Sequence, residues 1–169
     1  LKAQDTAELF FDDCEIPGEN LLGQEGMGFI YLMQKLQPER LICAVGAQAA
    51  AERCLEMTVE YAKERKLFGK PLSKFQNTQF VLAELAAEIA VGRSFVDDLI
   101  RAHMDGKSVM NETCMAKFWV TEMAKRVADR CLQIFGGYGY CTEYPISRFY
   151  LDARIQTIYA GTSEVMKLI

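Results

Sequence analysis

The side chains that could support chemistry in this chain are few. His103 is the only histidine, and no two of the six cysteines form a CxxC pair. Zinc sites and nucleophiles activated by histidine therefore lack their usual ligands and bases, and no metal site is expected. The cysteines are expected to be buried thiols in a reducing compartment, because each lies in an apolar or helical context: Cys14, Cys43, Cys54, Cys114, Cys131 and Cys141.

The remaining candidates are one carboxylate, one guanidinium and two helix ends that contain glycine. Glu39 follows Pro38, where a carboxylate is stabilised by the helix dipole whether or not it has a catalytic role. Arg65 closes a long helical pattern; its planar charge suits phosphate oxygens but also suits a solvated helix C-terminus. Gly136-Gly137 and Gly161-Thr162 leave backbone N–H groups at helix ends, which can bind a dinucleotide or serve as caps.

Length, charge and hydropathy indicate one soluble domain that binds no nucleic acid. The 169 residues, half of them apolar, suffice for one globular domain. Nineteen Lys and Arg against 23 Asp and Glu give a net charge of −4, and no basic stripe suggests a nucleic-acid partner. No apolar run approaches the roughly 20 residues of a membrane span, so a soluble protein is expected. Residues 1–6 do not resemble a signal segment, and the start is expected to be a cut edge.

The first part of the chain predicts a β tail. Residues 7–11 combine strand formers, and the turn residues that follow end this segment quickly. We therefore assign residues 1–22 to the tail of a preceding β domain with its connecting loop, and residues 23–169 to a helical domain.

Four long helical segments follow in the pattern of apolar residues. The first runs to about Lys66, and Pro38 should kink or restart it. The second is expected over 71–104, the third from the Asp105-Gly106 turn to residue 135, and the fourth over 145–154; a short helix opens at residue 161. Amphipathic helices joined by short loops predict an all-α fold, an antiparallel up-and-down four-helix bundle.

Three segments resemble the acyl-CoA dehydrogenase family in sequence, order and spacing. They are RKLFGK at residues 65–70, QIFGGYGY at 133–140 and IYAGTSE at 158–164. The PGENLLG and GMGF elements before residue 30 are similar to the family's exit from its middle β domain. The resemblance thus covers nearly the whole chain and implies the family's carboxyl-terminal helical domain.

This resemblance implies an activity and its partners. Members of the family oxidise an acyl-CoA thioester to the 2-enoyl-CoA, passing a hydride to FAD and electrons onward to an electron-transferring flavoprotein. A homo-oligomer, a dimer of dimers, is implied because the family's equivalent of Arg65 reaches the flavin of a neighbouring subunit. The compartment would be the bacterial cytoplasm or the mitochondrial matrix.

The catalytic base is expected at Glu39. Many family members carry it as a glutamate in the last segment, at the position that is Ala160 here. The long-chain and isovaleryl types place a glutamate on the first long helix instead, in a pattern that Pro38-Glu39-Arg40-Leu41 resembles. Loss of the α-proton from a thioester needs an acceptor, and burial makes a carboxylate a stronger base.

Further site residues are implied by the same likeness. The backbone N–H of Ala160 would donate to the thioester carbonyl. The expected cofactor contacts are Arg65, Phe68, Gln76, Gln133, Ile134, Phe135, Gly136, Gly137, Thr162, Ser163 and Glu164. The expected substrate contacts are Ile30, Tyr31, Leu32, Met33, Arg40, Tyr159, Ala160 and Gly161.

Other functions stay open from the sequence. One is a helical oligomerisation or binding module that has lost catalysis. Another is an acyl-CoA oxidase-like or nitroalkane oxidase-like flavoenzyme, although the latter would favour an aspartate as base. The length of the preferred acyl chain is also open, with a lean towards long or branched chains because the base position is of the Glu39 type.

Overall fold

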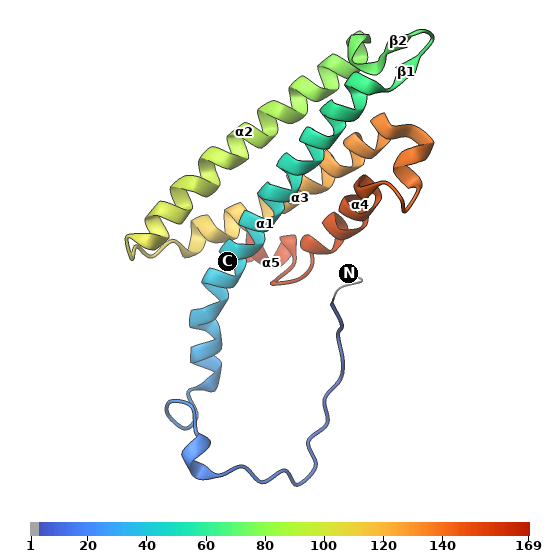
Figure 1. The fold of residues 1–169 in the computed structure, drawn as a ribbon. Coiled ribbons are helices and arrows are strands. Elements are labelled where there is room, and N and C mark those ends of the chain that lie inside the picture. The colour runs from blue at the N-terminus through green and yellow to red at the C-terminus, as the bar shows by residue number, and fades with distance from the viewer. Residues whose placement is uncertain (1–3) are drawn as a thin grey trace.

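The computed structural model describes residues 4–169, and helices dominate it (Figure 1). Successive helices run in opposite directions, which confirms the prediction of an all-α antiparallel bundle. The bounds are Gly28–Glu64 for α1, Gln76–Met104 for α2, Met110–Phe135 for α3, Pro145–Gln156 for α4 and Ser163–Leu168 for α5.

Pro38 bends α1 without interrupting it. The helix is continuous through Pro38, which excludes the predicted restart. Figure 1 shows that the first turns of α1 extend beyond the bundle and run in a different direction from the rest. A proline inside a helix removes one hydrogen bond and crowds the preceding turn, which accounts for the change of direction. Glu39 therefore lies where α1 enters the bundle.

A β-hairpin that the sequence did not predict separates α1 from α2. Its strands are β1 (Lys66–Leu67) and β2 (Lys70–Pro71), which pair antiparallel. Phe68 and Gly69 form the two-residue turn, with φ of +50° and +80°. Two left-handed residues match the twist of a tight hairpin, but phenylalanine is an unusual residue for the first of them. The 3-10 helix Leu72–Lys74 then leads into α2, which starts later than expected.

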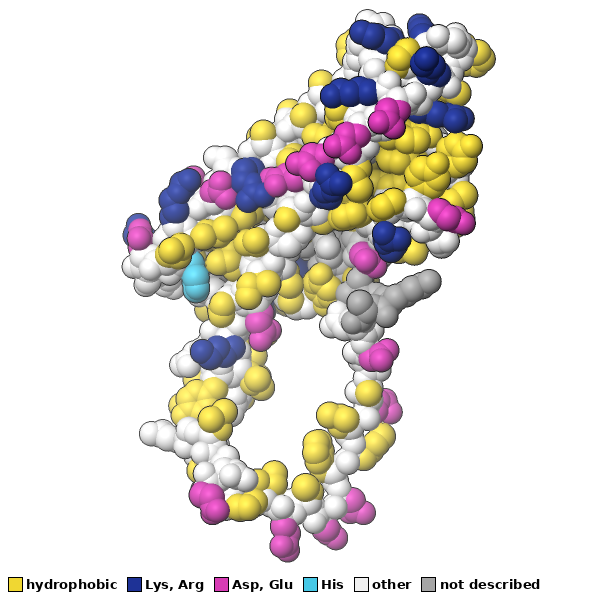
Figure 2. Space-filling model, viewed as in Figure 1, with side chains coloured by type: hydrophobic (Ala, Val, Ile, Leu, Met, Phe, Trp, Pro, Cys, Tyr) yellow, Lys and Arg dark blue, Asp and Glu magenta, His cyan; other side chains and the backbone are white. Residues whose placement is uncertain are grey.

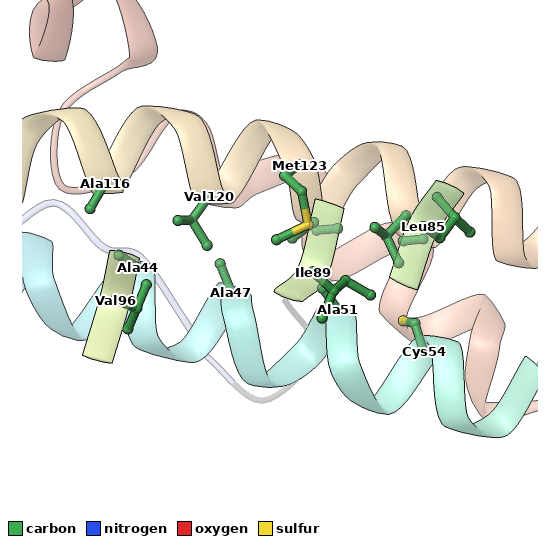
Figure 3. Packing of buried hydrophobic residues seen from close by; sticks show 14 of the residues in the cluster. Ala44, Ala47, Ala51, Cys54, Leu85, Ile89, Val96, Ala116, Val120 and Met123 are labelled. Carbon is green, nitrogen blue, oxygen red and sulfur yellow. The ribbon is translucent and has the colours of Figure 1, made fainter. Parts of the chain in front are cut away.

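Small residues let α1 and α3 approach closely in the core. Figure 3 shows Ala44, Ala47 and Ala51 of α1 facing α3, where Val120 and Met123 lie opposite. All five side chains are at most 1% exposed. Leu85, Ile89 and Val96 of α2 complete this core, as the apolar pattern of residues 71–104 predicts. On α3, Met115 falls at helical spacing with the buried Met123 and Val127, yet it is 53% exposed, so the apolar face of the third predicted helix is only partly buried.

Residues 4–27 lie outside the bundle (Figure 1). Residues 7–11, expected to form a β segment, pair with no strand of the described chain, since β1 and β2 make up its sheet. Leu9, Phe10 and Phe11 are each more than 75% exposed. An isolated segment has no ladder partner, so strand-forming residues alone do not make it a strand.

The cysteines are not uniformly buried. Cys54, Cys114 and Cys131 are buried, as expected, whereas Cys14 and Cys141 are exposed and Cys43 is intermediate. Burial raises the pKa of Cys131 to about 11, with smaller opposing contributions from Thr58 and Arg130. Within residues 4–169, no helix is both long and apolar enough to cross a membrane.

Candidate functional site

A pocket of about 710 Å³ lies at the hairpin end of the bundle. It is formed by the end of α1, the start of α2, the end of α3 and the 3-10 helix Gly136–Tyr140. Figure 2 shows hydrophobic side chains gathered below the hairpin at this end of the molecule. The residues that line the pocket include six of the predicted cofactor residues, namely Arg65, Gln133, Ile134, Phe135, Gly136 and Gly137.

Arg65 offers an uncompensated positive charge to this pocket. Its guanidinium carbon lies 5.1 Å from the centre of the Tyr138 ring, and within residues 4–169 it has no carboxylate partner. By contrast, Arg130 also lines the pocket but forms an ion pair of 2.7 Å with Glu84. A guanidinium that stacks on an aromatic ring and keeps its N–H groups free suits an anionic ligand such as a diphosphate.

An aromatic cluster fixes the glycine-containing end of α3. The rings of Tyr61 and Phe135 stack with centroids 4.1 Å apart, and the Tyr61 hydroxyl donates to the Phe135 carbonyl over 3.3 Å. Beyond this clamp, Gly136 has a φ of +62°, and a Cβ at Gly136 or Gly137 would meet no atom within 4 Å. The backbone is therefore uncovered at this point, and its contact with a cofactor stays a prediction.

Five predicted cofactor residues lie outside the pocket lining, and two of them, Phe68 and Gln76, are near the hairpin. Phe68 is at the hairpin tip and is 96% exposed. Gln76 is exposed at the start of α2, where Asn77 and Thr78 line the pocket instead. Their positions are set by the unpredicted hairpin, which turns the tip outward and starts α2 later in the sequence.

A second group of predicted residues meets where α1, α3 and the segment after α4 come together. Lys117 of α3, which is 0% exposed, donates from Nζ to the Gly161 carbonyl oxygen over 2.5 Å. Cys43 lies one helical turn after Glu39, and burial raises the pKa of its thiol, with Lys117 opposing and Glu39 reinforcing that shift. Burial also raises the pKa of Tyr159, and Cys43 raises it further. Cys43 is thus close enough to Glu39, Lys117 and Tyr159 for their charges to interact.

The segment at Ala160 has an unusual backbone. Ala160 has a φ of +54° and Gly161 a φ of +98°. A left-handed alanine costs about 1–2 kcal/mol, so the surrounding contacts must hold it in place. At Gly161 a Cβ would lie 2.6 Å from Cε of Met166, so a larger residue would have to displace that side chain and also adopt an unfavourable positive φ. Strained residues of this kind gather at functional sites.

Glu39 itself is exposed on α1 and has no ion pair or hydrogen bond within residues 4–169. Arg40 points into the bundle, with Nη1 3.8 Å from Sγ of Cys114. Its Nε is buried without a partner among the described residues. The predicted acyl wall, Ile30 to Met33, lies on the protruding part of α1, where Leu32 is 65% exposed and Tyr31 packs over Gly23.

The start of α5 is a capped helix end. Thr162 is the N-cap residue, and its Oγ1 accepts from Val165 N over 3.3 Å. Ser163 donates from Oγ to Oε1 of Glu122 over 3.0 Å, which ties α5 to α3. The N–H of Glu164 and the Thr162 side chain lower the pKa of the Glu164 carboxyl. The structure therefore contains the helix cap at Thr162. A cofactor role for Thr162, Ser163 and Glu164 stays a prediction.

Replacing Thr162 by alanine should loosen α5. The loss of an N-cap side chain costs about 0.5–2 kcal/mol, so amide hydrogen exchange over residues 163–168 should rise by roughly 2- to 30-fold. Mass spectrometry of deuterium uptake measures this directly. Thr142→Ala, at an exposed turn position, is the matched control. Unchanged exchange in Thr162→Ala would show that the cap does not hold α5.

Within residues 4–169, no group of three or more His, Cys, Asp or Glu side chains could hold a metal ion. The arrangement instead offers a pocket lined by Arg65 without a carboxylate partner among the described residues at one end, and a left-handed backbone segment held by Lys117 at the other.

Comparison with known proteins identifies the family. Residues 26–169 match the family described as "Acyl-CoA dehydrogenase, C-terminal domain". This chain belongs to the acyl-CoA dehydrogenase family. It is 50% identical over 167 residues to the long-chain specific acyl-CoA dehydrogenase of Sus scrofa mitochondria, covering 99% of this chain and 39% of that protein. It is 43% identical over 169 residues to the short-chain specific enzyme of Mus musculus mitochondria, covering 100% and 41%.

A solved structure shows the same fold. The crystal structure of an acyl-CoA dehydrogenase from Geobacillus kaustophilus matches with a TM-score of 0.91 and 56% identity, covering 94% of this chain and 42% of that one. The chain thus spans about two fifths of the length of these acyl-CoA dehydrogenases.

Several pocket residues were not predicted from the sequence. Tyr61, Asn77, Thr78 and Arg130 line the pocket although no motif marked them, and Lys117 was expected only as part of a helix. The signal that could have found Lys117 is its position on the apolar face of α3. It falls at helical spacing between Cys114 and Thr121, both buried, where a lysine is out of place unless it has a partner.

Proposed function

We propose that the protein to which this chain belongs is an FAD-dependent acyl-CoA dehydrogenase. It would convert an acyl-CoA thioester to the 2-enoyl-CoA, with Glu39 removing the α-proton. The observation that carries this proposal is the contact of Lys117 with the Gly161 carbonyl, together with Cys43, one turn after Glu39, whose charge would act on both Lys117 and Tyr159. Of the two positions that the family uses for its base, only Glu39 is a carboxylate in this chain.

The chain's own residues account for the acid–base part of the reaction. The free Glu39 carboxylate would accept the α-proton, since it has no competing ion pair among the described residues. The N–H of Ala160, held in its left-handed geometry, would donate to the thioester carbonyl and stabilise the charge that develops there. FAD would supply the hydride acceptor, and an electron-transferring flavoprotein would take the electrons onward.

Two separate regions of the chain would contact FAD. Gln133 and Lys117 are 16 residues apart on α3, which corresponds to about 24 Å at about 1.5 Å per residue. The pocket at Arg65 and the start of α5 therefore lie too far apart to be one compact site. This separation supports a homo-oligomer in which the first region contacts the flavin of a partner subunit and the second, Thr162 to Glu164, contacts the chain's own flavin.

The direct test uses the full-length, FAD-loaded protein. It is mixed without oxygen with butyryl-, octanoyl-, palmitoyl- and isovaleryl-CoA, and the flavin absorbance and the acyl products are followed. Rapid bleaching with formation of the 2-enoyl-CoA is expected, fastest with a long or branched chain. Absence of bleaching with the whole panel would reject the proposed activity and favour the non-catalytic binding module. Fast reoxidation of the reduced flavin by oxygen would favour an oxidase.

A further inference from the structure

Lys117 is the largest side chain that the fold buries completely. An ammonium group out of water is costly unless it is paired, yet within residues 4–169 it forms no ion pair with a carboxylate. Its hydrogen-bond acceptor is the carbonyl oxygen of Gly161, 2.5 Å away. Burial lowers the pKa of Lys117, an effect that Arg40 increases and that Cys43 and two glutamates oppose. A buried lysine aimed at one backbone carbonyl points to a specific role for that contact.

The contact is made at the strained part of the segment. Ala160 and Gly161 are consecutive left-handed residues, which persist only where neighbours fix them. Other hydrogen bonds lie on either side of the pair. Before it, Tyr159 N donates to the Ile155 carbonyl over 3.2 Å; after it, Ser163 N donates to the Thr157 carbonyl and the Ser163 hydroxyl to Glu122, each over 3.0 Å. Among the hydrogen bonds of the described residues, the one that Lys117 donates is the one that either left-handed residue accepts or donates.

We propose that Lys117 is a positioning residue for the dehydrogenation proposed above, and the inference rests on that proposed function. By holding the Gly161 carbonyl, it fixes the backbone of the left-handed pair and therefore the direction of the Ala160 N–H. That N–H must point at the position where the thioester oxygen gains charge. Lys117 touches neither substrate nor flavin in this role.

A positioning role and a merely structural one differ in their kinetic signature. Loss of a structural contact lowers stability and the amount of folded enzyme, but not the acidity of the bound α-proton. Misalignment of the N–H weakens a contact that strengthens as charge develops, so kcat falls while KM changes little. Removing one such donor outright slows reactions by about 10²- to 10³-fold, so its misalignment should cost at least about tenfold.

The test uses the full-length, FAD-loaded enzyme with Lys117→Met, which keeps the volume and removes the donor. One readout is the rate of flavin reduction by the best acyl-CoA. The other is a 3-thia-acyl-CoA, in which sulfur replaces the β-carbon, so that the bound analogue loses its α-proton without being oxidised. The long-wavelength absorption band of the enolate beside oxidised flavin reports its apparent pKa. Thr113→Val is the matched control, because Thr113 is fully buried one turn earlier on α3 and its hydroxyl has no partner.

Lys117→Met is expected to reduce flavin at least about tenfold more slowly and to raise the apparent pKa of the analogue by about one unit, with its affinity changed by less than about threefold. Thr113→Val should match the wild type. Wild-type rate and analogue pKa in Lys117→Met would overturn the proposal. If Lys117→Met does not fold, Lys117→Gln decides in its place, because its amide is one atom too short to reach Gly161. A rate within about twofold of wild type would then overturn the proposal. A wild type that neither reduces flavin nor ionises the analogue would instead refute the proposed function.

Discussion

Glu39→Gln is expected to slow flavin reduction by acyl-CoA by about 10²- to 10⁴-fold in the full-length enzyme. Glutamine keeps the size of the side chain and its place on α1, but it cannot accept a proton. Because Glu39 belongs to neither of the two regions proposed to contact the flavin, FAD should stay bound. Stopped-flow absorbance under anaerobic conditions measures the rate, and the spectrum of the purified protein measures the flavin content.

Glu60→Gln is the matched control for this substitution. Glu60 is also an exposed glutamate of α1, but it lies nearly six turns further along the helix. Its replacement should leave the rate within about twofold of wild type, as is usual for a surface change away from a site. If Glu39→Gln and Glu60→Gln behaved alike, Glu39 would not be the base.

Arg65→Gln is expected to weaken FAD binding by about 10- to 100-fold. The reason is the loss of a charge-assisted hydrogen bond, which contributes about 1.5–3 kcal/mol. The guanidinium is held over Tyr138 without a carboxylate partner among the described residues, so its interaction with an anion would not compete with an ion pair. Titration of the apoprotein with FAD, followed by the quenching of flavin fluorescence, gives the dissociation constant.

Arg53→Gln is the control for general charge effects. Arg53 is another arginine of α1, exposed and paired with Glu56 at 3.1 Å. Its loss removes the same charge from the chain but leaves the pocket intact, so FAD affinity should change by less than about twofold. An equal loss of affinity in both variants would mean that overall charge, and not a contact from Arg65, governs FAD binding.

The helices could be predicted because their apolar residues recur at helical spacing. Leu85, Ile89, Val96 and Leu99 mark the buried face of α2, and they are all buried in the structure. The hairpin could not be predicted, because the turn at Phe68-Gly69 has a phenylalanine where asparagine or aspartate is usual. Its two-residue strands are also too short to show alternation.

The site was predictable only in part, because sequence motifs mark residues and not the contacts between them. The glycines at 136 and 137 and the arginine at 65 were found through their motifs, and they share one pocket. Lys117 belongs to no motif; its place on the apolar face of α3 marks it as unusual, but its partner is a backbone carbonyl 44 residues away in the chain. The left-handed Ala160 was equally hidden, because alanine gives no indication of a positive φ.

The most direct test of the central claim is to move the base. The claim is that Glu39 and the side chain at position 160 face the same substrate carbon. Single-turnover flavin reduction by the best acyl-CoA would be measured in Glu39→Gln and in the double variant that adds Ala160→Glu. The account predicts that the double variant reduces flavin at least about tenfold faster than Glu39→Gln, because a carboxylate again reaches the α-proton. An undiminished rate in Glu39→Gln would contradict it, and so would a double variant that binds FAD and acyl-CoA but remains as slow as Glu39→Gln.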